Sequence, residues 1–297
     1  MILARTLTLL AILGVVPSCA LGQRAIGAIV EMVSGSVLLK QDGKEVRLKP
    51  GIDVARSLFV GDRLYCEKAA KLTIRAGSRT IELDENSGWY TIAPPESQQF
   101  KKVVDAYGRT GGRDRGDFTI PILYAPANES SVVAEQFIVR WSPLKQSCLI
   151  SFVIQDSNGR EMWRQGEVNG PSGLLRSTAA VRSLVNYREN KGSGVLQLKL
   201  RDSCGNEDRV SFTLLSVVDE SSLNQELVAW DSEKNPFMAH LGRASVFVAY
   251  EMFAQAADEY EAALKLAPAS RALLTRTIAA QRRTGNRARA EELKRRL

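Results

Sequence analysis

Few side chains of this sequence are placed to do chemistry, and the cysteines give the clearest pattern. Cys148 directly precedes an apolar run at 149–154, and Cys204 follows a second apolar run at 195–200. If these runs are antiparallel neighbouring strands, the start of one lies beside the end of the other and the two thiols meet. An oxidising compartment then favours a disulfide between Cys148 and Cys204. The alternative is two ordinary buried cysteines, and Cys66 is expected to be a small core residue.

The other reactive side chains give little support for catalysis. His240 is the only histidine, so a histidine-based triad or metal cluster has no second histidine to use, and its helical setting favours a structural role. The carboxylate pair Asp258-Glu259 has the pattern of a solvated helix face. Gly111-Gly112 lacks the Gly-Lys-Ser/Thr sequence and the helix of a phosphate-binding loop. We expect no enzyme activity, no catalytic residue, no cofactor and no metal site.

The net charge of +7 lies at the end of the chain. From Arg271 onward there are nine basic and two acidic residues, a difference equal to the whole net charge. Such a segment suits an acidic protein or an anionic lipid, whereas nucleic acid is not expected because no reading motif or interleaved aromatic residues accompany the charge. The candidate partner-binding residues are Arg282, Arg283, Arg287 and Arg295.

Short strands separated by glycine turns must form the first part of the chain. Asp42-Gly43 is typical of a two-residue hairpin turn, and Leu72 and Ile74 alternate with polar residues as in a half-buried strand. The run GSVLLKQDGKEVRLKPG, followed by LFVGDRL and AAKLTIRAGSRTIEL, resembles the FecR-like periplasmic domain. The resemblance implies an all-β envelope module, often solenoid-like, that acts by contact and not by chemistry.

Residues 120–215 return to a strand pattern with regular turns, which indicates a β-sandwich. The segments FIVRWSPL, CLISFVIQDSNGREMW and GVLQLKLRDSCGN are similar to an immunoglobulin-like or fibronectin type III-like domain. Residues 169–190 depart from that pattern and indicate a helix. Trp141 and Trp163 are expected in the core, with sugar stacking as the alternative.

The C-terminal part is helical. Asn235-Pro236 predicts a helix start, and the phrase FAQAADEYEAALKLAP resembles one tetratricopeptide repeat, with a truncated second repeat after Ala269. Fewer than three repeats rarely stand alone, so the pair must dock on the β domains, dimerise, or lie beside a helix at 222–230.

An apolar run at 7–16 follows Arg5 and is too short to span a bilayer, which fits a signal peptide. The mature chain is expected to begin near Leu21 or Gln23. Lipidation of Cys19 is the less favoured alternative because Pro17 suits such a signal poorly, and only that lipid would tether the protein to a membrane.

The predicted fold class is a multidomain, mainly β protein. Its parts are a signal peptide at 1–22, a FecR-like all-β domain at 24–95, a short helix and Gly/Arg-rich linker at 96–118, an immunoglobulin-like β-sandwich at 119–217 and a tetratricopeptide-like helical region at 218–297. This order favours a non-catalytic adaptor or scaffold in the periplasm or cell envelope, with envelope proteins, acidic ones included, as partners. The alternatives are a FecR-type regulatory sensor working through a membrane partner, and a protein that binds cell-wall glycan or polysaccharide.

Overall fold

The computed structural model describes residues 25–77, 79–94, 123–142, 148–168 and 173–297. The predicted signal peptide, Cys19, the short helix and the Gly/Arg-rich linker lie outside the described residues. Strands and helices each account for 35% of the described residues, which makes it a mixed α/β multidomain protein with open, mostly antiparallel sheets. The prediction of a mainly β fold was therefore wrong in its balance, because two helices, α2 (Thr178–Lys191) and α3 (Val217–Asp231), accompany those of the predicted repeats.

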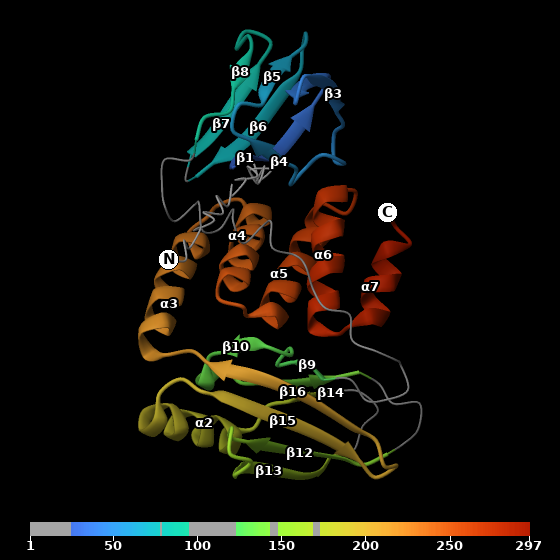
Figure 1. The fold of residues 1–297 in the computed structure, drawn as a ribbon. Coiled ribbons are helices and arrows are strands. Elements are labelled where there is room, and N and C mark those ends of the chain that lie inside the picture. The colour runs from blue at the N-terminus through green and yellow to red at the C-terminus, as the bar shows by residue number, and fades with distance from the viewer. Residues whose placement is uncertain (1–24, 78, 95–122, 143–147, 169–172) are drawn as a thin grey trace, which may run out of the picture.

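The first module consists of two open sheets of four antiparallel strands (Figure 1). Sheet order is β4-β1-β6-β7 in one and β3-β2-β5-β8 in the other. The strands are β1 (Ile26–Ser34), β2 (Val37–Gln41), β3 (Lys44–Leu48), β4 (Ser57–Phe59), β5 (Arg63–Cys66), β6 (Lys71–Ala76), β7 (Arg79–Asp84) and β8 (Tyr90–Thr91).

Local sequence explains the turns of this module. Asp42 (φ 51°) and Gly43 (φ 76°) join β2 to β3 as the hairpin pattern predicts. The apolar run at 59–65 is broken by Asp62, which is fully buried and accepts hydrogen bonds from the Phe59 backbone N–H and the Gln41 amide, both at 2.9 Å. Cys66 is buried in the core as predicted, and burial, followed by the nearby Asp84 carboxylate, raises the pKa of its thiol.

The second module pairs a five-stranded sheet, β10-β16-β15-β12-β13, with a three-stranded sheet, β14-β11-β9. Helix α2 confirms the helix indicated for 169–190, and the Ser177 side chain caps its first turn. The other elements are β9 (Leu123–Ala125), β10 (Ser130–Val132), the 3-10 helix η1 (Ala134–Gln136), β11 (Val139–Trp141), β12 (Ile150–Gln155), β13 (Glu161–Val168), β14 (Gly173–Leu175), β15 (Val195–Asp202) and β16 (Glu207–Leu214).

The helical layer is formed by α3 and four further helices, each packed against the next. These are α4 (Pro236–Ala249), α5 (Phe253–Leu266), α6 (Arg271–Thr284) and α7 (Arg287–Lys294). Helix α3 confirms the helix indicated at 222–230 and packs against α4, the first helix of the predicted repeats. At this contact the Tyr250 hydroxyl donates to the Glu226 carboxylate at 3.1 Å, and burial together with that carboxylate raises the pKa of Tyr250 to about 12. None of the helices in the described ranges is long and apolar enough to cross a lipid bilayer.

Gly242 sets the distance between α3 and α4. A Cβ at this position would lie 2.1 Å from two ring carbons of Trp230. Alanine in place of glycine ordinarily stabilises a helix interior by about 1 kcal/mol. Here we expect Gly242→Ala to lower the free energy of unfolding by about 1–3 kcal/mol, because the indole has to move out of a packed interface. Urea denaturation followed by tryptophan fluorescence measures the change.

The double variant Trp230→Leu/Gly242→Ala is the matched control, because a smaller side chain leaves room for the new methyl group. It should be more stable than predicted from the two single changes. Gly166→Ala, whose Cβ would meet nothing within 4 Å, controls for the loss of glycine. A stabilised Gly242→Ala variant would contradict the steric interpretation.

Candidate functional site

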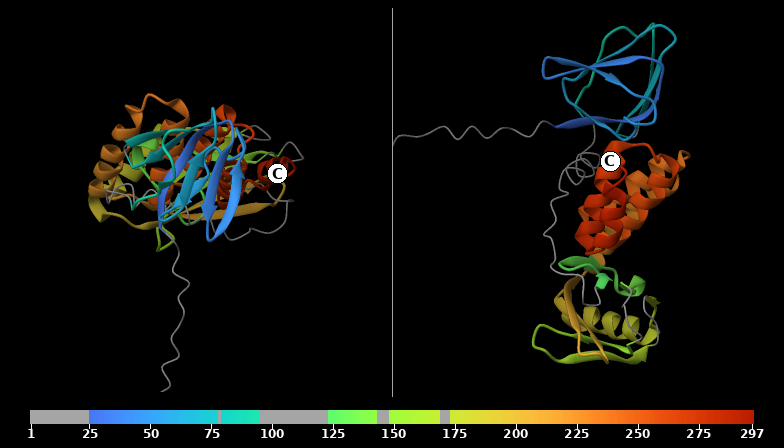
Figure 2. Two further views of the ribbon diagram at one scale, coloured as in Figure 1. Left: turned by 90° about the horizontal axis from the view of Figure 1, so that it is seen from above. Right: turned by 90° about the vertical axis from the view of Figure 1, so that its right-hand side faces the viewer.

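The helical layer lies between the two β modules, and each end of it contacts one of them (Figures 1 and 2). The layer and parts of both modules share one apolar core cluster. Ile29 and Ala55 join it from the first module, and Val133 joins it from the second; the fully buried side chain of Tyr260 belongs to the same cluster. The helices of the predicted repeats thus contact both β modules, which was one of the arrangements expected for them.

Helix α6 makes the polar contacts with the first module. The Ser270 hydroxyl donates to the Val54 carbonyl, just before the first turn of α6. In the second turn of α6, the guanidinium of Arg276 donates to the Ala55 carbonyl at 2.9 Å and to the Ser57 hydroxyl at 2.8 Å. Arg276 belongs to the basic segment, and its guanidinium forms hydrogen bonds within the molecule.

Arg75 forms a second contact between the first module and the layer. Its side chain is 9% exposed and lies between two carboxylates, that of Glu31 at 2.6 Å and that of Glu233 at 2.9 Å. Glu31 belongs to β1, whereas Glu233 lies just before α4, so a single buried cation links sheet to helix. Removal of one partner of such a pair leaves the other partner's buried charge without compensation, which is strongly destabilising.

The opposite end of the layer contacts the second module. Arg140 of β11 donates twice to the Asp258 carboxylate of α5, at 2.8 and 2.6 Å. The Ser131 backbone N–H donates to the Glu251 carbonyl at 3.1 Å, and Glu251 has a positive φ of 58°. Asp258 is therefore an ion-pair partner, although the sequence suggested only a solvated helix face.

The structure separates the four candidate partner-binding arginines. Arg283 lies 4.5 Å from the ring centroid of Phe253 and 4.0 Å from the carboxylate of Glu129 in the second module. Arg282 is paired with Glu291 at 3.1 Å, and its side chain is 38% exposed.

Arg287 and Arg295 lie at opposite ends of α7, about 12 Å apart along the helix axis. Helix α7 forms one edge of the layer (Figure 1). Arg295 is exposed beyond its last residue, and Arg287 is half-buried at its start. Arg282, Arg283 and Arg287 thus gather around the α6–α7 turn, while Arg295 stands apart from them.

His240 belongs to a charged cluster on α4 and α5. Its Nδ1 atom lies 2.7 Å from Glu259 and 2.9 Å from Arg243, and Arg243 also contacts Glu259 at 3.2 Å. The two contacts with Glu259 join α4 to α5, whereas the contact between His240 and Arg243 lies within α4. The geometry agrees with the structural role expected for this histidine.

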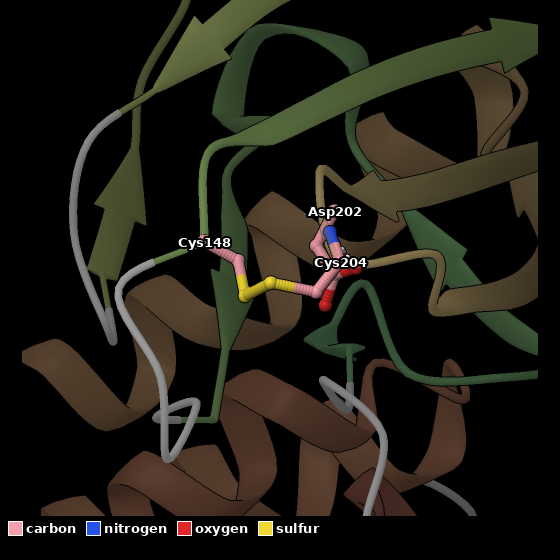
Figure 3. Close-up of side chains that lie close together, drawn as sticks. All are labelled: Cys148, Asp202 and Cys204. Carbon is pink, nitrogen blue, oxygen red and sulfur yellow. Dashed lines mark hydrogen bonds between the residues drawn. A yellow bond between two sulfur atoms is a disulfide. The ribbon is translucent and has the colours of Figure 1, made fainter.

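Cys148, Asp202 and Cys204 are the one group of potential metal ligands that comes together in the part of the chain described by the structure. Figure 3 shows that the two sulfurs are bonded to each other, so they offer no thiolate. Strands β12 and β15 are antiparallel neighbours, with Ile150 opposite Asp202. Asp202 accepts hydrogen bonds from the backbone N–H groups of Cys204 and Asn206, so its carboxylate shapes the turn.

The tryptophans of the second module are core residues. Trp141 is 2% exposed and Trp163 is 7% exposed, and the Trp141 ring packs 5.1 Å from that of Phe152. Neither side chain offers a face on which a sugar ring stacks.

Comparison with known proteins does not assign this chain to a family. No protein-family model matches the chain, and no curated protein is similar to it. Among solved structures, the chain has a likeness to the crystal structure of CopC from Methylosinus trichosporium OB3b, with 19% sequence identity and a TM-score of 0.19. That likeness covers 32% of this chain and 92% of CopC, and similarity at this level defines neither a fold nor an activity. The structure defines the class only, as a mixed α/β protein with a helical layer between two β modules.

Proposed function

We propose that this protein is a non-catalytic adaptor or scaffold of the bacterial envelope that acts by protein–protein interaction. The proposal includes the FecR-like, immunoglobulin-like and tetratricopeptide-like character of its three parts. The observation that carries it is the attachment of the helical layer at both ends, through Arg75 and Arg276 at one end and Arg140 at the other. Such an arrangement holds the surfaces of the two β modules and the helical layer in fixed relative positions, which suits the binding of partner proteins more than catalysis.

An exported location fits the disulfide. Disulfides persist in oxidising compartments such as the bacterial periplasm and are rare in the cytosol. The bond between Cys148 and Cys204 therefore supports the address that the N-terminal sequence suggests.

We place the partner surface along α7 and the α6–α7 turn. Arg282, Arg287 and Arg295 belong to this edge of the layer, and an acidic protein would be drawn to it. Arg283 is left out of the proposed contact because it already lies against Phe253 and Glu129.

Charge reversal in the full chain tests this surface. In cells, a photo-crosslinking amino acid in place of Ala288, which is exposed on α7, should capture one acidic envelope protein. The triple variant Arg282→Glu/Arg287→Glu/Arg295→Glu should reduce that product about tenfold or more, because like charges then face each other.

The matched control changes the charge equally on the second module. Three of its exposed arginines, Arg160, Arg164 and Arg201, are replaced by glutamate. If this control loses the product as well, the interaction depends on net charge alone. If both variants keep it, α7 is not the partner surface and the proposal fails.

A further inference from the structure

One tryptophan of the first module is exposed and held in place. Trp89 lies directly before β8 and is 40% exposed. Its ring centroid is 5.4 Å from that of Tyr65, and the Arg63 guanidinium carbon lies 4.9 Å from the indole centroid. We call Arg63, Tyr65 and Trp89 the Trp89 platform.

The alternation of β5 explains how the platform is built. Arg63 and Tyr65 are two residues apart, so they project from the same face of the sheet, whereas Leu64 and Cys66 are buried on the other face. Both outward side chains therefore support the indole. An aromatic ring fixed before binding loses little conformational entropy when a ligand arrives.

The surroundings of the platform are polar. Across the sheet, Lys40 lies opposite Arg63, and Leu38 lies opposite Tyr65. The next strand places Glu45 opposite Lys40 and Arg47 opposite Leu38, and Arg47 is paired with Glu67 at 3.1 Å. The Glu45 and Glu67 carboxylates balance the charges of Lys40 and Arg47. Arg63 therefore leaves this face with a net positive charge beside the exposed indole.

The apolar area is too small for a protein interface. A stable protein–protein contact buries about 800 Å² on each partner and has an apolar core. Each aromatic side chain buries roughly 150–250 Å² at most, and here the indole and phenol already overlap. The partly exposed indole instead matches one sugar ring, whose C–H groups stack on aromatic rings and whose hydroxyls bond to polar neighbours.

We propose that the Trp89 platform binds an acidic polysaccharide. A sugar ring stacks on Trp89, and Arg63 beside it faces the carboxylate of a uronic acid residue. Strands β5 and β8 lie at the end of the first module that points away from the helices (Figure 1). Binding of a glycan here is therefore independent of the partner surface proposed on α7.

Binding is tested with the intact mature protein and polygalacturonate in affinity electrophoresis. Polygalacturonate should retard the wild type, and Trp89→Ala should weaken the apparent affinity about tenfold, because truncation of an anchoring tryptophan is among the costliest changes at a binding surface. Trp89→Tyr should restore most of the binding. Met32→Ala is the matched control, since Met32 is 49% exposed in the other sheet of the same module.

Two further probes separate stacking from charge. Dextran, a neutral glycan, should retard the protein less than polygalacturonate does. Any retardation by polyglutamate should be the same for the wild type and Trp89→Ala. The proposal is overturned if the wild type does not bind polygalacturonate, or if Trp89→Ala binds it as well as the wild type. If dextran retards the protein as strongly as polygalacturonate does, the claim that the bound polysaccharide is acidic is wrong. Crosslinking through α7 reports separately on the adaptor function.

Discussion

Replacement of Arg75 by methionine is expected to lower the free energy of unfolding by about 3 kcal/mol, because the Glu31 and Glu233 carboxylates then lose their shared buried cation. Methionine keeps much of the side-chain volume, so the effect reports on charge more than on packing. The first module should also separate from the helical layer at lower urea concentration. Urea denaturation combined with limited proteolysis measures both changes.

Two variants test this explanation. Removal of both carboxylates together with the cation, in Arg75→Met/Glu31→Gln/Glu233→Gln, should recover most of the lost stability, because no buried charge is left unpaired. Arg47→Met should cost less than about 1 kcal/mol, since the Arg47–Glu67 pair is exposed. If Arg75→Met is as mild as Arg47→Met, the buried pair does not hold the first module to the layer.

Removal of the disulfide has the other large expected effect. The bond closes a loop with a sequence separation of 56 residues. In the chain-entropy model such a cross-link contributes about 4 kcal/mol, so Cys148→Ser/Cys204→Ser should lose stability of that order. The loss should fall on the second module, where β12 and β15 carry the two cysteines. Thermal unfolding with and without a reductant measures it.

Reductant supplies the internal control for the disulfide. The reduced wild type should unfold at the temperature of the double serine variant, and that variant should not respond to reductant. Cys66→Ala should keep the full response, because Cys66 is a buried free thiol in the other module. A wild type whose unfolding temperature is unchanged by complete reduction would show that the bond contributes nothing to stability.

Much of the local structure could be predicted from sequence, because its causes lie within a few residues. Asp42-Gly43 specifies a hairpin turn, the alternation of Leu72 and Ile74 specifies a buried strand face, and Asn235 caps α4 with its own side chain. The position of Cys148 and Cys204 at the ends of two strands was enough to suggest their pairing. The balance of strand and helix was wrongly predicted as mainly β, although helices were indicated at 169–190 and 222–230, where the structure has α2 and α3.

The contacts between the parts could not be predicted. Sequence alone marked Arg282, Arg283, Arg287 and Arg295 as one basic group, but Arg283 lies against the second module and Arg295 stands at the far end of α7. It gave no sign that Arg75, within a strand, meets Glu233 before a helix. It drew attention to Trp141 and Trp163, which are buried, and passed over Trp89, which is exposed.

The difference between what the sequence predicted and what it did not has a physical reason. Turn chemistry, capping and hydrophobic alternation act between near neighbours in the chain, so the sequence by itself determined the strands, the hairpin and most of the helices. An ion pair or an exposed ring depends on how separately folded elements dock, which is set by the whole shared core that includes Tyr260. Only the tertiary structure decided which arginines join the modules, and which tryptophan faces the solvent.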